Sequence, residues 1–128
     1  MKIYIAAPWI SREDMFEVAK SLEDAGHEIT HAWWETKDRP VDSPGYDMFL
    51  RWCAVADVAG AVAADALFVV NSAKSEGKAV EQGIGIAQNK PIVIVGKRGE
   101  HSVNVFHYLP NYHWVDNIQD GIQKLQEL

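Results

Sequence analysis

The stretch 57-DVAGAVAADALFVVNSAKSEGKAVEQG-83 decides the fold of this chain. Ala66 to Val70 is a short apolar run rich in β-branched and aromatic residues, which predicts a buried strand. A polar loop, Asn71 to Gly77, separates this run from a helix-like segment that begins near Lys78. In an open parallel sheet such a loop lies at the carboxyl end of its strand, where ligands bind. The helix start after it offers unpaired N–H groups suited to a phosphate.

Two carboxylates, Asp57 and Glu81, flank this predicted strand. Glu81 is expected about one turn into the helix, facing the crevice at the end of the strand. Each acid also has an ordinary explanation, since Asp57 could be a solvated helix residue and Glu81 could complement the helix dipole. Ser75 and Gly77 precede Glu81 and supply a hydroxyl and backbone donors beside it. The arrangement therefore predicts an active site.

Working outward, apolar runs of strand type and helix type alternate along the chain. The predicted strands are Lys2 to Ala6, Glu28 to Ala32, Ala66 to Val70, Pro91 to Val95 and an edge strand at His113 to Val115. Four helices are predicted: one after an N-cap at Ser11, one from Tyr46 to Ala64, one from Lys78 to Gln88, and one after a cap at Asp116. This alternation indicates βαβ units. We expect a single three-layer α/β domain over residues 1–128, with a mainly parallel sheet of about five strands.

Apolar spacing also predicts which helix faces are buried. Phe16, Ala19, Leu22 and Ala25 mark one face of the first helix, and Phe49, Trp52, Val55 and Ala56 mark one face of the second. Gly60 in the second helix is expected to permit close packing. The polar segments 35–45 and 96–112 are expected to be loops, and the first is long enough to cover a site.

Composition limits the classes of function. The net charge of −6 argues against a nucleic-acid polymer as partner, because such binding rests on basic residues. No signal peptide or membrane-spanning run is evident, and the single Cys53 fits a reducing compartment, so we expect a cytoplasmic protein without membrane association. The five histidines lack paired ligand spacing, so no metal or other cofactor is predicted. The Gly77-Lys78 pair lacks the remaining residues of a Walker phosphate loop.

Four features in order give the chain a family resemblance. They are the ending Ala6-Ala7-Pro8-Trp9 of the first strand, the D-x-x-G-x-x-x-x-D pattern from Asp57 to Asp65, the G-x-x-x-E-x-G pattern from Gly77 to Gly83, and Asn104. The set resembles the nucleoside 2-deoxyribosyltransferase superfamily, including its relatives that hydrolyse nucleoside 5′-monophosphates. The resemblance covers most of the chain and implies a flavodoxin-like (Rossmann-like) fold.

The resemblance also implies roles for particular residues. Glu81 matches the glutamate that attacks the anomeric carbon, Asp57 matches an aspartate that assists it, and Tyr4 matches a tyrosine near these carboxylates. The substrate-binding residues implied are Ala7, Trp9, Arg12, Ser75, Gly77 and Asn104. A carboxylate near the sugar stabilises the positive charge that develops when an N-glycosidic bond breaks. Trp9 is the residue expected to contact the base, because aromatic faces stack on nucleobases.

The residue six positions before Glu81 separates hydrolysis from transfer. The deoxyribosyltransferases resemble one another in having an aspartate there, whereas Ser75 resembles the monophosphate hydrolases. A carboxylate at that position would repel a phosphate. Asn104 is more similar to the transferases, and the segment from Ala7 to Ser11 departs from the glycine- and serine-rich loop of the hydrolases.

The leading hypothesis is an N-glycosidase that hydrolyses a (deoxy)nucleoside 5′-monophosphate to free base and sugar 5-phosphate. One alternative is a 2-deoxyribosyltransferase that exchanges bases. Another, from a different class, is a non-catalytic nucleotide-binding or assembly module. The partner expected is therefore a small nucleotide or nucleoside. The resemblance further implies a homodimer or higher homo-oligomer in which the loop bearing Asn104 reaches a neighbouring active site.

Overall fold

A computed structural model describes all residues from 1 to 128 and contains one five-stranded sheet. The strands are β1 (Lys2–Ala6), β2 (Glu28–Ile29), β3 (Ala66–Val70), β4 (Ile92–Val95) and β5 (Tyr112–Val115). Their order across the sheet is β2-β1-β3-β4-β5, and every neighbouring pair is parallel. The chain adds β2 on one side of β1 and then β3, β4 and β5 on the other side. The crevice at the carboxyl ends of β1 and β3 is therefore the expected ligand site of the fold.

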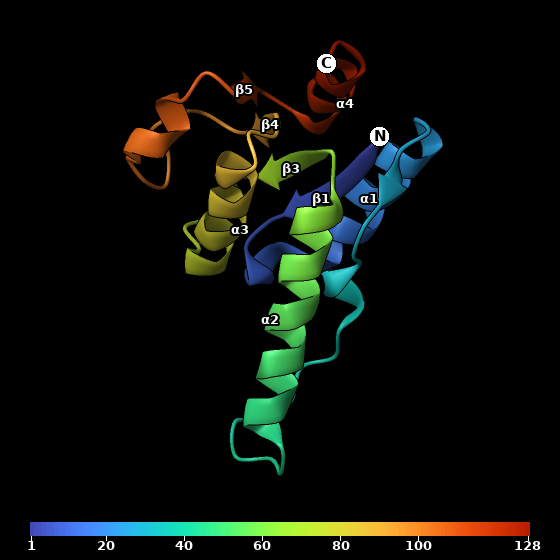
Figure 1. The fold of residues 1–128 in the computed structure, drawn as a ribbon, viewed down its shortest axis with the longest axis vertical. Helices are drawn as coiled ribbons and strands as arrows, with labels where there is room; N and C mark the ends of the chain where they lie inside the picture. Colours follow the sequence, from blue (N-terminus) through green and yellow to red (C-terminus); the bar gives the residue numbers. More distant parts are fainter.

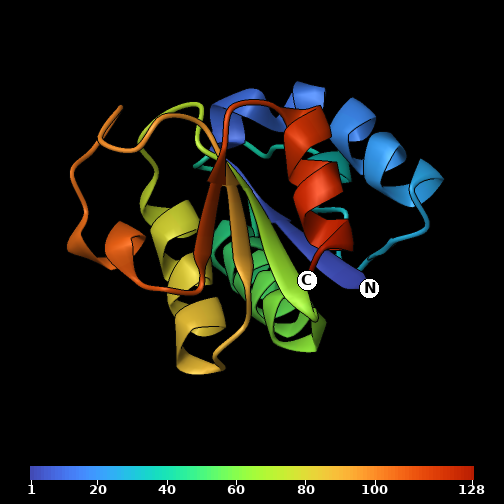
Figure 2. The same cartoon turned by 90° about the horizontal axis from the view of Figure 1, so that it is seen from above.

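The helices cover both faces of the sheet. They are α1 (Met15–Asp24), α2 (Tyr46–Ala63), α3 (Glu76–Ala87) and α4 (Ile118–Gln126), with short 3-10 helices η1 (Trp9–Asp14), η2 (Trp33–Glu35) and η3 (Val105–Tyr108). Figure 2 shows α1 and α4 on one face and α2 and α3 on the other. The predicted three-layer, flavodoxin-like α/β fold is therefore confirmed.

The central strands form the core because both faces of the sheet are covered. Residues Ile3–Ala6 of β1, Ala66–Val69 of β3 and Ile92–Ile94 of β4 are fully buried. Their nearly continuous apolar runs are typical of strands in a covered parallel sheet. Among them, Tyr4 places a hydroxyl in the interior, where it requires a hydrogen-bond partner.

Several predicted element boundaries were wrong. The predicted strand Glu28 to Ala32 ends at Ile29, because the chain then bends and the Thr30 hydroxyl donates to the Gly60 carbonyl oxygen, with an O···O distance of 2.8 Å. Ser11 is not an N-cap, since η1 precedes α1 and the Ser11 hydroxyl pairs with that of Ser72 instead. Helix α3 begins at Glu76 rather than Lys78, with Ser75 as its N-cap. Asn117, not Asp116, caps α4.

Two predictions of buried helix faces also need correction. Phe16 is 46% exposed, and the buried face of α1 is formed by Met15, Val18, Ala19 and Leu22. On α2, Trp52 is 71% exposed and Val55 is 63% exposed, and only Gly60 and Ala61 of this helix are buried. The reason is that α2 extends beyond the edge of the sheet (Figure 1), so helical periodicity alone did not identify the face that meets the core.

Gly60 packs closely, as predicted. A Cβ atom at this position would lie 2.8 Å from the Cβ of His31 and 3.0 Å from the Tyr4 ring. Glycine thus lets the last turns of α2 approach β1 and the segment after β2.

None of the helices in this fold has the length and apolar character needed to cross a membrane.

Candidate functional site

The centre of the site is a contact between a strand and a helix far apart in the sequence. The Tyr4 hydroxyl on β1 donates a hydrogen bond to Oε2 of Glu81 on α3. The two side chains meet because β1 lies beside β3 and α3 packs back over both strands. Tyr4 is fully buried, and Glu81 is largely shielded from solvent. The contact supports the predicted proximity of these two residues.

Burial controls the protonation of this pair. The pKa of Glu81 is raised to about 7, chiefly by desolvation; the hydrogen bond from Tyr4 opposes this rise, and the nearby charge of Asp57 adds to it. Desolvation and the charge of Glu81 raise the pKa of Tyr4 above its usual range, so the phenol stays protonated and remains a donor. Glu81 can therefore exchange between its neutral and ionised forms near neutral pH.

Asp57 on α2 lies beside a histidine that the sequence analysis did not single out. The Nε2 atom of His31 lies 3.3 Å from Oδ1 of Asp57. Burial raises the pKa of the Asp57 carboxyl, and the charge of His31 opposes that rise. The sequence did not indicate a role for His31 because the predicted strand Glu28 to Ala32 ran through it, whereas β2 ends at Ile29. Its position just past a strand adjacent to β1 is the signal that could have identified it.

An apolar cavity of about 210 Å³ opens beside Asp57 and His31. Its lining residues come from the start of η1, the segment around η2 and the outer half of α2: Trp9, His31, Trp33, Thr36, Asp38, Phe49, Leu50, Cys53 and Asp57. We call it the aromatic cavity. The ring centroids of Trp9 and Trp33 are 6.2 Å apart, and Trp33 is anchored by donation from Nε1 to the Ile5 carbonyl oxygen, 2.7 Å away.

The aromatic cavity combines flat apolar walls with polar groups at one end. Trp9 lines the cavity and is 41% exposed. Thr36 and Asp38 come from the segment 35–45, in agreement with the expectation that this loop lies over a site. Burial and the charge of Asp57 raise the pKa of the Cys53 thiol, which makes it a poor nucleophile here.

The remaining predicted residues do not gather around Glu81. Ala7, the residue after β1, is 6% exposed with its side chain in the core, so only its backbone is suited to contact a ligand. Arg12 donates from Nη1 to the Trp9 carbonyl oxygen at 3.1 Å, and its guanidinium lies 4.6 Å from the Trp9 ring centroid. Gly77 lies in the exposed first turn of α3.

Ser75 and Asn104 belong to a second, more polar cavity. The Oγ atom of Ser75 accepts from the Lys78 backbone N–H at 3.2 Å, which caps α3. The Oδ1 atom of Asn104 accepts from the Phe106 N–H at 3.0 Å and caps η3. Both residues line a cavity of about 430 Å³ that none of Tyr4, Asp57 and Glu81 lines. The structure contains no cluster of three or more His, Cys, Asp or Glu side chains placed to hold a metal ion.

Fold and site together define a flavodoxin-like α/β protein in which a half-buried, titratable carboxyl group on α3 contacts Tyr4 of the central strand β1. Two solved structures share the fold. The CMP N-glycosidase BcmB of Clostridium botulinum has a TM-score of 0.64 and 20% sequence identity, covering 99% of this chain and 98% of that chain. A 2-deoxyribosyltransferase from the psychrotolerant bacterium Bacillus psychrosaccharolyticus has a TM-score of 0.61 and 20% identity, covering 94% of this chain and 89% of that chain. No protein-family model and no curated protein sequence matches the chain.

Proposed function

We propose that this protein hydrolyses the N-glycosidic bond of a (deoxy)nucleoside 5′-monophosphate, with Glu81 as the nucleophile and without a cofactor. The observation that carries the proposal is the buried Glu81 carboxyl group, held by the Tyr4 hydroxyl and close enough to Asp57 for their charges to interact. Glycoside cleavage requires two carboxyl groups that lie in different environments. A CMP N-glycosidase with the same fold over nearly the whole chain supports this substrate class.

In the first step, a carboxylate oxygen of Glu81 attacks the anomeric carbon C1′ of the sugar. The C1′–N bond breaks, its electron pair goes to the base nitrogen, and the departing base takes a proton from Asp57. A carboxyl group whose pKa burial raises is suited to hold that proton. The Tyr4 hydroxyl donates to the other oxygen of Glu81 and keeps the nucleophile oriented. The products of this step are free base and a glycosyl ester of Glu81.

In the second step, water attacks C1′ and the bond from C1′ to the Glu81 oxygen breaks. Asp57, now ionised, takes a proton from the water, so both acids return to their starting states. His31 stands 3.3 Å from Asp57, where its imidazole orients that carboxyl group and stabilises its charge while it is ionised. His31 acts through Asp57 and is therefore a positioning residue.

The aromatic cavity next to Asp57 is the proposed site of the base. Trp9 and Trp33 offer ring faces on which a base can stack, at the point where Asp57 can reach the departing nitrogen. For the 5′-phosphate we propose the free N–H groups at the start of α3 around Ser75 and Gly77, with charge support from Arg12. Ala7 would contact the sugar through its backbone at the end of β1.

Transfer of deoxyribose to a second base is the alternative enzyme activity. A 2-deoxyribosyltransferase also has this fold, and the same ester of Glu81 would be intercepted by a base instead of water. In a non-catalytic binding module, by contrast, nucleotide would bind without release of base. Both alternatives use the same crevice, so they are distinguished by products.

The experiment is chromatography of free base released from a panel of nucleosides and their 5′-monophosphates, each incubated with and without a second base. We expect release from monophosphates without an acceptor. Products that form only when an acceptor is added would replace hydrolysis by transfer, and binding without products would reject both activities. Glu81→Gln should lower kcat/KM by at least roughly a thousandfold, because it removes the nucleophile. Glu17→Gln on the exposed face of α1 is the matched control.

We also propose that the chain works as a homo-oligomer with shared active sites. Support comes from an apolar stripe on α2, formed by Met48, Trp52, Val55, Ala59 and Val62, whose members recur at helical spacing and are all exposed. Exposed apolar stripes of this kind mark interfaces between proteins. The helix projects away from the sheet (Figure 1), where a second copy could pack along it and the loop bearing Asn104 could approach a neighbouring site.

Sedimentation of the wild type and Trp52→Glu tests this arrangement. We expect an oligomeric wild type, dissociation of the variant, and a parallel loss of turnover, because a charge replaces the largest exposed side chain of the stripe. Lys20→Glu, on an exposed face of α1, should change neither the mass nor the turnover. A fully active monomer would exclude shared sites.

A further inference from the structure

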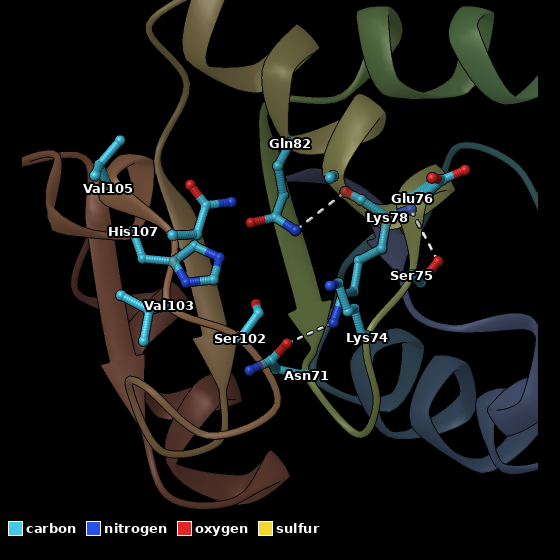
Figure 3. Close-up of a pocket in the computed structure, with 12 residues that line it drawn as sticks. Asn71, Lys74, Ser75, Glu76, Lys78, Gln82, Ser102, Val103, Val105 and His107 are labelled. Atoms are coloured by element: carbon cyan, nitrogen blue, oxygen red, sulfur yellow. Dashed lines mark hydrogen bonds between the residues drawn. The ribbon is translucent and has the colours of Figure 1, made fainter.

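The larger cavity lies along a face of α3 that includes Lys78 and Gln82, and neither Glu81 nor Tyr4 lines it. It has a volume of about 430 Å³ and is bounded by the loop after β3, the first half of α3 and the segment 102–107. Figure 3 shows Asn71, Lys78 and Gln82 facing Ser102 and His107 across it. We call it the Lys78 cavity. Its volume falls within the range of cavities that hold small organic ligands.

Lys78 is the unusual residue of this cavity. It is only 5% exposed, yet none of the ion pairs in the structure includes it. Its ammonium group donates to Oδ1 of Asn71 at 2.5 Å and to the Ala73 carbonyl oxygen at 2.7 Å. An ammonium group has three N–H donors, so one is left without a protein acceptor. A buried cation ordinarily has an anionic partner, because desolvation of an unpaired charge is unfavourable.

Asn71 provides a second unfilled donor at the same place. This residue is 5% exposed and lines the cavity, and its Nδ2 atom is buried with no hydrogen-bond partner. Its Oδ1 atom is already occupied by the Lys78 ammonium group, which fixes the orientation of the amide. Buried polar atoms without a partner are uncommon in native proteins. Asn71 and Lys78 therefore present unfilled donors close together in the interior.

The remaining polar groups of the cavity also favour an anion. Ser102 contributes a hydroxyl from the facing segment, and Lys74 adds a second positive charge at the exposed rim. Burial and the positive charges of Lys78 and Arg98 lower the pKa of His107, so its imidazole adds no strong positive charge of its own. Glu76 is the one acidic side chain of the lining; it is exposed and forms no ion pair with Lys78.

We propose that the Lys78 cavity is a second ligand site, which binds the oxyanion group of a small metabolite, a phosphate ester or a carboxylate, between the Lys78 ammonium group and the Asn71 amide. The ligand anion would accept from the third N–H of Lys78 and from Nδ2 of Asn71, and it would neutralise the only buried cation of the cavity. Val103 and Val105 on the facing segment offer apolar contacts for the rest of the ligand. This site does not require the proposed reaction at Glu81.

The test is a titration of the full chain with inorganic phosphate and, separately, with sodium acetate, in a buffer without other oxyanions. Binding is followed by NMR through the side-chain amide of Asn71 and the backbone amide of Val103. We expect saturable shifts of both signals. Lys78→Met should weaken binding at least about tenfold, because it removes a charge-assisted hydrogen bond. Tighter binding of phosphate would identify a phosphate ester as the ligand class, and tighter binding of acetate a carboxylate.

Three further variants make the result decisive. Lys20→Met removes an exposed lysine that pairs with Asp24, and it should leave the affinity unchanged. Arg12→Met, which removes the charge support of the proposed 5′-phosphate site, should also retain the binding, which separates this site from the proposed reaction. Ser102→Leu places an apolar side chain on the facing wall and should weaken binding even if Lys78→Met folds poorly. Unchanged affinity in both Lys78→Met and Ser102→Leu, or no saturable shift in the wild type, would overturn the proposal.

Discussion

The two sides of α3 show how one helix buries opposite charges in different ways. Glu81 faces β1 and receives a hydrogen bond from Tyr4, whereas Lys78 faces the loop after β3 and donates only to neutral oxygens. Residues three apart on a helix are neighbours and can form an ion pair. These two do not, because Glu81 is held by the Tyr4 hydroxyl and the Lys78 ammonium group is held by Asn71 and the Ala73 carbonyl oxygen.

Burial moves the two pKa values toward each other. It raises the pKa of Glu81 to about 7 and lowers that of Lys78 to about 8, since desolvation disfavours the charged form of both groups. The side containing Glu81 supplies a second titratable acid in Asp57, which suits a reaction that moves protons. The side containing Lys78 supplies unfilled donors and no buried acid, which suits binding. The comparison suggests that chemistry and ligand binding are divided between the two sides.

The largest expected effect is a pH-dependent change in the free energy of unfolding that reports on Glu81. The pKa of Glu81 is raised from 4.5 to about 7 in the folded state, so folding favours its protonated form. Its contribution to stability is therefore complete below pH 4.5 and is lost as the pH rises through 7, a change of about 3 kcal/mol. Urea unfolding should show Glu81→Gln gaining about that much stability relative to the wild type between pH 4.5 and pH 8. A constant difference would show that Glu81 is not desolvated, and Glu17→Gln should give such a constant difference.

A substitution at Gly60 tests the packing around Tyr4 and His31, which support Glu81 and Asp57. In Gly60→Ala the new Cβ would lie 2.8 Å from the Cβ of His31 and 3.0 Å from the Tyr4 ring. Overpacking of this kind costs about 1–3 kcal/mol in the free energy of unfolding. Turnover should fall at least about tenfold, because both groups that support the carboxylates are displaced. Anion binding in the Lys78 cavity should persist, and its loss would show that the two sides are not independent.

Gly83→Ala is the matched control for that substitution. Nothing lies within 4 Å of a Cβ atom at position 83, which is in the middle of α3. Removing a mid-helix glycine without a clash should raise the free energy of unfolding by about 0.5–1 kcal/mol. If Gly83→Ala were as harmful as Gly60→Ala, general disturbance of the helix pair would explain both results.

The last expected effect concerns a single hydrogen bond. Tyr4→Phe removes the donor that lowers the pKa of Glu81, so that pKa should rise above about 7. The pH profile of turnover should move to higher pH, and the rate at pH 7 should fall about tenfold. Rates measured from pH 5 to pH 9 would show the shift. An unchanged midpoint with a lower maximum would mean that Tyr4 orients Glu81 without affecting its ionisation.

The sequence indicated the residues around Glu81 more fully than those of the Lys78 cavity. The pattern from Asp57 to Glu81 identified both carboxyl groups, and Tyr4 followed from the resemblance. His31 was missed because the predicted strand ran through it, whereas β2 ends at Ile29 and releases the next residues toward α2. The role of Ser75 in substrate binding stays a prediction, and only the structure shows that this residue also caps α3 and lines the Lys78 cavity.

By itself the sequence determined the order of strands and helices, because continuous apolar runs and helical spacing are local patterns. It also indicated that a carboxylate would lie about one turn into the helix that follows β3. Only the tertiary structure decided which of these groups lose their water. The environments of Glu81 and Lys78 depend on Tyr4 and on the segment 102–107, which lie far from α3 in the sequence. Desolvation depends on all atoms nearby in space, and it therefore has no local signature in the chain.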